Sequence, residues 1–441
     1  MTIRRIKAFL VTAFMAMASS ALNAQTLIPS LDSLLAYALP KSISLQTGDV
    51  RMAQAKKAKL AAILSIPDVS GSLTGSYTNN TLLPVSLFPG EFFGGAPGSY
   101  REVQTGVQYN TVFNENIDVK LLNPKGWESL RLARINIEAT ASDNRLTLKT
   151  LQENIVASYY NIINLQEQII NVKQNLEAAD TLLSIVRNRQ IEGLAKQQDV
   201  NDAMASRLNT KETLAQLYYL IRQQYLGLHV LTDIPASDSL KLTERVSEDW
   251  QPDRPLISTN TLAFNNSLLK EKLALSTYRQ QKYALYPTLS FFQSYSSQRF
   301  STDGKILGND ARWIPSSYIG LRLTVPIPSS SAISQTSKAR YDYLAAQKTR
   351  QQESVQSALE SLQLEAEFDK SLSQLSTNQE VYLLHKDSYE KNLLLYREGL
   401  ISLDQTLTSF NNMVNGRYNL ISAKVSLLAA KAKIQINNRI Q

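Results

Sequence analysis

The sequence predicts a mixed α/β fold in which long antiparallel coiled-coil helices and four β-strands form two internal repeats. Glycine and proline, the main terminators of helices, are absent from two long stretches, residues 127–192 and 329–398. Alternating apolar and polar residues precede each stretch and predict strands. The same order of elements occurs in both halves of the 441-residue chain, which indicates an internal duplication.

Composition excludes several functional classes. Hydrophobic residues make up 43% and charged residues 19% of the chain, so it is neither disordered nor a bundle of membrane-spanning helices. There are no cysteines and two histidines, His229 and His385, which argues against disulfides, metal sites and cysteine nucleophiles. The formal charge of +8 is dispersed and does not favour a nucleic-acid partner. We expect no cofactor and no bound metal.

Residues 1–24 are predicted to be a signal peptide. Three basic residues within the first seven precede an apolar run that ends in small residues. Cleavage is expected after Ala24, with Ala21 as the alternative. The apolar run is shorter than the ~20 residues that a membrane-spanning helix needs. The chain is therefore expected to be exported.

The first long stretch carries a heptad repeat. Apolar residues recur every seven positions, at Leu148, Ile155, Ile162, Ile169, Leu176 and Leu183. A companion row, apolar at five of six positions, comprises Leu151, Ser158, Leu165, Val172, Ala179 and Val186. A strict seven-residue period predicts a left-handed coiled coil. At ~1.5 Å per residue the helix would extend roughly 100 Å.

The second long stretch keeps a sparser seven-residue spacing, at Leu375, Tyr382, Tyr389 and Tyr396. Each long helix is expected to end at a single glycine, in Glu192-Gly193-Leu194 and in Glu398-Gly399-Leu400. One glycine suits the left-handed residue of a tight helix-to-helix turn. Beyond the second turn the heptad resumes at Leu407, Val414, Ile421 and Leu428.

Four strands are predicted, at residues 68–77, 103–113, 288–297 and 318–325. Each has one apolar and one polar face. The loop over residues 78–102 joins the first pair and is rich in Pro, Gly and Phe. Its phenylalanines are Phe88, Phe92 and Phe93. They either contact lipid, a partner or neighbouring copies, or fold over the mouth of a barrel that the strands would help to form.

The chain is expected to comprise a first repeat at 25–232, a linker at 233–260 and a second repeat at 261–441. Each repeat runs helix, two strands, long helix, glycine turn and shorter helix. The opening helices are predicted at 31–66 and 261–286, and Pro67 and Pro287 each end a helix and open a strand.

The strand count indicates a membrane protein made of several copies. Four strands with an apolar face cannot close a barrel alone, and open sheet edges are not tolerated in lipid. An exported chain would combine its strands with those of other copies in one barrel, while the long helices project away from the membrane. The prediction is an oligomeric tube, part barrel and part helical.

The order of elements, the paired prolines and the two Glu-Gly-Leu turns resemble the TolC family of outer-membrane efflux channels. The segment Tyr396-Arg-Glu-Gly-Leu-Ile-Ser-Leu-Asp-Gln-Thr-Leu is similar to that family's tyrosine-x-x-glycine-leucine stretch. The resemblance covers essentially the whole mature chain. It implies a homotrimer whose chains share one transmembrane β-barrel and one periplasmic α-helical tunnel, in the outer membrane of a Gram-negative-type cell.

The resemblance also implies a function and partners. The trimer would be the exit duct of a tripartite efflux or type I-like secretion system, in contact with outer-membrane lipid, a periplasmic adaptor (a membrane fusion protein) and an inner-membrane pump. The adaptor would dock on the turns, at Glu192, Gly193, Leu194, Glu398, Gly399 and Leu400. Two departures stand out. Asn123-Pro124-Lys125-Gly126 and Pro328-Ser329-Ser330 replace the family's usual glycine pairs, and Glu192 and Glu398 replace a small apolar residue.

A periplasmic gate is implied six and nine positions after each turn glycine, where carboxylates of the family form constricting rings. These positions hold Asp199 and Asp202 in the first repeat and Gln405 and Thr408 in the second. The acidic function is therefore expected in the first repeat, where threefold symmetry would gather six carboxylates. The alternative is that both aspartates only favour a helix N-terminus.

Two other functional classes fit the sequence less well. An enzyme is not expected, because the sequence contains no phosphate loop, no His-Glu-x-x-His and no Gly-x-Ser-x-Gly motif. A periplasmic coiled-coil adaptor or scaffold without a barrel is the alternative to a channel. It would not need two alternating hairpins in equivalent places.

Overall fold

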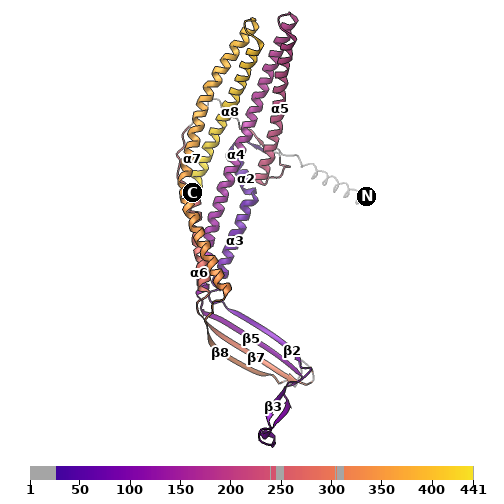
Figure 1. Ribbon diagram of the computed structural model, residues 1–441, viewed down its shortest axis with the longest axis vertical. Coiled ribbons are helices and arrows are strands. Elements are labelled where there is room, and N and C mark those ends of the chain that lie inside the picture. Colours follow the sequence, from indigo (N-terminus) through magenta and orange to yellow (C-terminus); the bar gives the residue numbers. More distant parts are fainter. Residues whose placement is uncertain (1–25, 239, 245–252, 303, 305–311, 441) are drawn as a thin grey trace, which may run out of the picture. The chain divides into compact units, whose positions relative to one another are not determined.

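The computed structural model describes residues 26–238, 240–244, 253–302, 304 and 312–440, so the predicted signal peptide lies outside the described residues. The chain divides into two compact units (Figure 1). The helical unit comprises residues up to 51, 140–267 and 350 onward. The sheet unit comprises residues 52–139 and 268–349.

Seven α-helices lie within the described residues. They are α2 (Leu31–Ala38), α3 (Ile43–Leu64), α4 (Pro124–Ile191), α5 (Gln197–Thr232), α6 (Leu262–Tyr283), α7 (Ser330–Arg397) and α8 (Leu403–Arg439). The two stretches without glycine or proline each lie in one helix of 68 residues, α4 and α7. None of the described helices has an apolar span long enough to cross a membrane.

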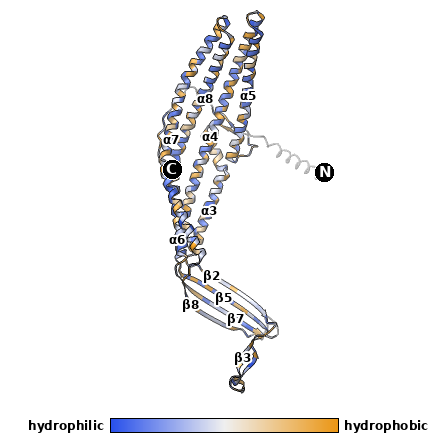
Figure 2. Cartoon of the chain, viewed as in Figure 1, coloured by the Kyte–Doolittle hydropathy of each residue, from blue (hydrophilic) through white to orange (hydrophobic). Residues whose placement is uncertain are grey.

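The heptad rows of the first long stretch form the buried stripe of α4. Ile155, Ile162 and Val186 have no exposed surface, and farther along the row Ile169 and Val172 pack against Leu217 of α5. Hydrophobic and hydrophilic residues are interspersed along both helices in Figure 2, as expected when one face of each helix is buried. The predicted coiled coil is confirmed here.

The heptad of α8 marks only part of its buried face, and Leu407, Val414 and Leu428 pack at the margins of apolar clusters. Its four heptad residues are only half-buried. The fully buried side chains include Phe410, Leu427 and Ile434. The helix packs against two neighbours, because Leu427 and Ile434 share a cluster with α7 residues, while Val425 shares one with α4 residues. A helix between two partners buries a wider face than one heptad row predicts.

The first helix predicted over 31–66 is interrupted. A short 3-10 helix, Leu39–Lys41, separates α2 from α3, because Pro40 lacks an N–H and cannot continue an α-helix. Next to it, β1 (Thr26–Ile28) pairs in parallel with β6 (Leu240–Leu242), within the predicted linker. These strands are too short to show alternation, and the sequence did not reveal them.

The sheet unit contains one four-stranded antiparallel sheet in the order β2-β5-β7-β8. Its strands are β2 (Ser70–Asn79), β5 (Tyr109–Leu122), β7 (Thr288–Ser301) and β8 (Ile314–Thr324). The strands of the two repeats join through β5 and β7, from Tyr109 opposite Ser301 to Leu122 opposite Leu289. Among the described residues, β2 and β8 are each paired along one edge only.

The single strand predicted over 103–113 is wrong, because two strands share that range. β4 (Tyr100–Gln104) pairs with β3 (Val85–Pro89) as a separate hairpin within the predicted loop, and β5 begins at Tyr109. Gly106 lies in the break with φ +100°, a left-handed conformation that interrupts a strand. Alternation continues across the break, so the pattern alone conceals it.

Candidate functional site

The first candidate docking turn joins α4 to α5 through Gly193. Its φ is +77°, in the left-handed region that favours glycine. The N–H of Leu194 donates to the carbonyl of Arg189 at 2.7 Å, and the N–H of Gly193 donates to that of Gln190 at 2.9 Å. This pair of bonds is the Schellman motif, which closes a helix and satisfies its last carbonyls.

The second turn repeats this geometry between α7 and α8. Gly399 has φ +76°. The N–H of Leu400 donates to Leu395 O at 2.9 Å, and the N–H of Gly399 donates to Tyr396 O at 3.0 Å. The left-handed glycine expected at each turn is therefore confirmed, and both repeats use the same backbone motif.

Both turns present the same side chains to solvent. Leu194 is 64% exposed and Leu400 is 71% exposed. Glu192 and Glu398 are exposed beside them. Each turn therefore offers one apolar side chain and one carboxylate on a rigid backbone, a combination suited to docking into an apolar pocket with a polar rim.

A small apolar core lies between the helices that meet at the two turns. We call it the turn core, and it consists of Leu182, Leu183, Val186, Val200, Ala203, Tyr396 and Leu403. Tyr396 is 4% exposed, so the tyrosine of the Tyr-x-x-Gly-Leu stretch is a core residue. Burial raises the pKa of its hydroxyl, Arg189 opposes this rise, and the negative charge of Asp199 adds to it.

The first gate position of each repeat caps a helix. The carboxylate of Asp199 accepts the backbone N–H of Lys196 at 2.7 Å, at the start of α5. In the second repeat the side-chain oxygen of Gln405 accepts the backbone N–H of Ser402 at 3.3 Å. Residues at this position satisfy donors that a helix N-terminus leaves open. This geometry favours the capping alternative for Asp199.

The second gate positions line two different cavities in the helical unit. Asp202 lines a cavity of about 380 Å³ with Asn175 of α4 and Asn411 of α8. Thr408 lines one of about 420 Å³ with Gln405 and with His385 of α7. Both Asp202 and Thr408 are exposed. Within one chain, the acidic and neutral gate positions are therefore not brought into one cavity.

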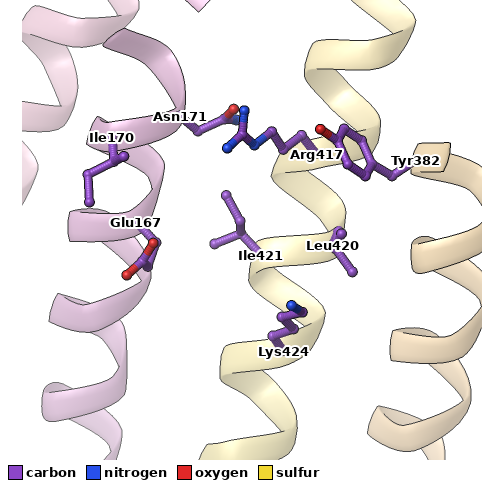
Figure 3. Close-up of a pocket in the computed structure, with 8 residues that line it drawn as sticks. All are labelled: Glu167, Ile170, Asn171, Tyr382, Arg417, Leu420, Ile421 and Lys424. Carbon is purple, nitrogen blue, oxygen red and sulfur yellow. The ribbon is translucent and has the colours of Figure 1, made fainter. Parts of the chain in front are cut away.

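A third cavity of about 130 Å³ lies between α4, α7 and α8 (Figure 3). Arg417 of α8 reaches toward Asn171 of α4 in this view. The Oδ1 atom of Asn171 is buried and has no hydrogen-bond partner in the part of the chain that the structure describes. The contact between α4 and α8 is thus polar at this level, in contrast to the apolar seam between α4 and α5.

One face of the sheet is polar and carries a ladder of side-chain hydrogen bonds. Serine and glutamine side chains of β7 donate to acceptors on β5 over 2.7–3.1 Å, in the pairs Ser290–Asp118, Ser294–Asn116, Ser296–Asn114 and Gln298–Asn110. On the same face Arg322 of β8 lies 3.5 Å from Asp118. These bonds fix the register between the two repeats.

The other face is apolar and open. Ile319, Leu321 and Leu323 of β8 are 69%, 66% and 66% exposed. Leu321 lies opposite Phe291 of β7, and Leu323 lies opposite Leu289. Contiguous exposed apolar surface on a sheet marks contact with lipid or another protein. The alternation predicted for β8 is thus confirmed.

Two polar contacts between helices were not predicted from the sequence. Arg189 contacts α7 from the end of α4, and a basic residue in the last turn of a helix was the available signal. The buried Lys149 lies 2.7 Å from Glu360 and 3.9 Å from Glu153. Burial raises the pKa of Glu153, and Lys149 partly opposes this. No heptad pattern predicts the pair of Lys149 with Glu360, because Glu360 lies on α7, whereas Glu153 is four residues along α4 from Lys149.

The fold is that of outer-membrane channels. VceC from Vibrio cholerae is 15% identical with a TM-score of 0.72, over 92% of this chain and 95% of that chain. The CmeC channel of Campylobacter jejuni is 18% identical with a TM-score of 0.69, over 92% and 85% of the two chains. The open-state MtrE channel of Neisseria gonorrhoeae is 15% identical with a TM-score of 0.66, over 93% and 88%.

Residues 36–232 match the outer membrane efflux protein family. No curated protein matches the sequence. The family match covers most of the first repeat, and the fold likeness extends over both repeats, so the chain is similar to TolC-like outer membrane efflux proteins. The second repeat, outside the matched range, has the same long helix, glycine turn and shorter helix as the first.

Proposed function

We propose that the chain is one of three identical subunits of an outer-membrane exit duct, through which an efflux or type I-like secretion system releases its substrate. The observation that carries this proposal is the four-stranded sheet, which has one open apolar face and, within the part of the chain that the structure describes, two edges without a partner strand. In water such a sheet would aggregate through its edges. In a membrane, other copies complete it.

The strand order supports ring closure by copies of the same chain. β2, β5, β7 and β8 alternate in direction, so β8 of one subunit meets β2 of the next in antiparallel sense. An even number of antiparallel strands is the rule for bacterial outer-membrane barrels. The number of subunits, three, comes from the family resemblance.

The two turns are proposed as the docking site for a periplasmic adaptor, which in turn contacts an inner-membrane pump. Leu194 and Leu400 supply exposed apolar contacts, and the Schellman motifs keep them rigid. Asp199, Asp202, Gln405 and Thr408 are proposed to surround the periplasmic entrance. Because Asp199 caps α5, Asp202 is the freer carboxylate of the pair.

The alternative, a periplasmic adaptor or scaffold without a barrel, is disfavoured by the same sheet. It would leave Ile319, Leu321 and Leu323 exposed to water along with both edges. The fold likeness to outer-membrane channels also extends over the sheet, since it covers 92% of the chain.

Fractionation and planar-bilayer recording test the proposal. We expect the protein in the outer-membrane fraction, with slower migration in unheated samples, and we expect the purified trimer to form discrete ion-conducting channels. Material from cells that lack the gene is the control for contaminating porins. Protein found in the soluble periplasm, without channel activity, would establish the scaffold instead.

A further inference from the structure

Arg189 links the two helical turns within one chain. It lies in the last turn of α4, and its Nη1 atom donates to the carbonyl oxygens of Tyr396 at 2.8 Å and Arg397 at 2.9 Å. Its guanidinium carbon lies 5.0 Å from the centroid of the Tyr396 ring. One side chain of the first repeat therefore binds the end of the long helix of the second.

The contact suits the chemistry of a helix end. The last carbonyls of a helix have no partner within it, and the partial negative charge there attracts cations. A planar guanidinium can bind two carbonyls while stacking on an aromatic ring, which an ammonium group cannot do. The Nε atom of Arg189 is buried and has no hydrogen-bond partner among the described residues.

Gly399 permits this approach. A Cβ atom at that position would lie 3.3 Å from Nη2 of Arg189, whereas a Cβ at Gly193 would meet no atom within 4 Å. The link also breaks the symmetry of the repeats. When Gly193 is aligned with Gly399, the position equivalent to Arg189 in the second repeat holds Leu395. The position equivalent to Tyr396 in the first repeat holds Gln190. Each chain therefore has one such contact, directed from the first turn to the second.

We infer that Arg189 is a positioning residue that holds the two turns at a fixed separation, so that Leu194 and Leu400 act as one docking element. The inference rests on the proposed docking function for its purpose but not for its geometry. Without Arg189 the turn core still packs, because Val186 and Leu403 remain, but the ends of α4 and α7 lose their direct polar link. The separation between the turns would then vary.

Electron spin–spin distance measurement tests the link directly. The chain has no cysteines, so spin labels at Glu192→Cys and Glu398→Cys, both exposed positions, report the separation of the turns. Labelled chains are diluted into unlabelled ones so that distances within one chain dominate. We expect a narrow distribution with Arg189 present and a clearly broader or longer one in Arg189→Gln. Arg189→Lys should broaden it as well.

Arg187→Gln is the matched control, because Arg187 is an exposed cation two residues away on the same helix and should leave the distribution narrow. Equal distributions for Arg189→Gln and its parent would overturn the inference, whether or not the protein is a channel. Conductance of the unlabelled Arg189→Gln trimer, recorded in parallel, reports on the duct. If the parent protein forms no channels, the proposed function fails independently of the distance result.

Discussion

Single residues decide how the helical turns and the entrance behave. Gly193 and Gly399 share a left-handed backbone, but they have different surroundings, since the side chain of Arg189 approaches only Gly399. Both the turns and their glycines were predictable from sequence, because a lone glycine between two heptad regions has one good explanation. Arg189 was not, because its partners are backbone carbonyls of a distant segment.

Replacing Gly399 with valine should abolish export while the trimer still forms. A left-handed residue with a side chain costs roughly 1–2 kcal/mol, and more when it is β-branched, and the new Cβ would also crowd Arg189. The measurement is export by cells carrying the variant, alongside cross-linking of the trimer. Normal export would mean that the turns are structural only.

Removing charge at the gate should raise conductance and weaken cation preference. Carboxylates gathered around a pore axis attract cations and repel anions. Asp199→Asn keeps an acceptor for Lys196 N–H, so the cap of α5 survives while the charge is lost. Single-channel recordings should show a small effect for Asp199→Asn and a larger one for Asp202→Asn. Parental conductance and selectivity in the double variant would place the gate elsewhere.

At the scale of elements, sequence patterns identified the strongly periodic segments and failed where an element is very short or where a break leaves the alternation undisturbed. The buried stripe of α4 was read from its heptads, although α4 packs against α5 and also against α8. The heptad of α8 captured only part of its buried face, because this helix contacts both α4 and α7. The strand predicted over 103–113 was wrong because Gly106 interrupts the strand without disturbing the alternation of apolar and polar residues.

The faces of β8 give the sharpest test at this scale. Leu321→Lys puts a charge on the apolar face and should cost about 2–4 kcal/mol at mid-bilayer depth, which reduces assembled protein in the membrane. Ser316→Lys, on the opposite face of the same strand, should be tolerated. Heat-modifiable migration of the two variants measures assembly. Normal assembly of Leu321→Lys with failure of Ser316→Lys would show that the faces are reversed.

At the scale of the whole molecule, a closed barrel requires that other copies complete the sheet. The sequence pattern of a single chain indicated that other copies are needed, because four strands cannot close a barrel by themselves. They could not reveal the number of copies, which depends on strand tilt and stagger between chains. That number rests on the resemblance to TolC-like channels.

Cross-linking between the edges of β2 and β8 tests whether three copies close one barrel. One cysteine is placed at Thr74 in β2 and a second is walked along Ser316, Tyr318 and Arg322 in β8, in a chain without native cysteines. At one register, oxidation or a short bis-thiol reagent should produce covalent dimers and trimers and nothing larger. A ladder that continues beyond the trimer, or no product at any register, would contradict a closed three-subunit barrel.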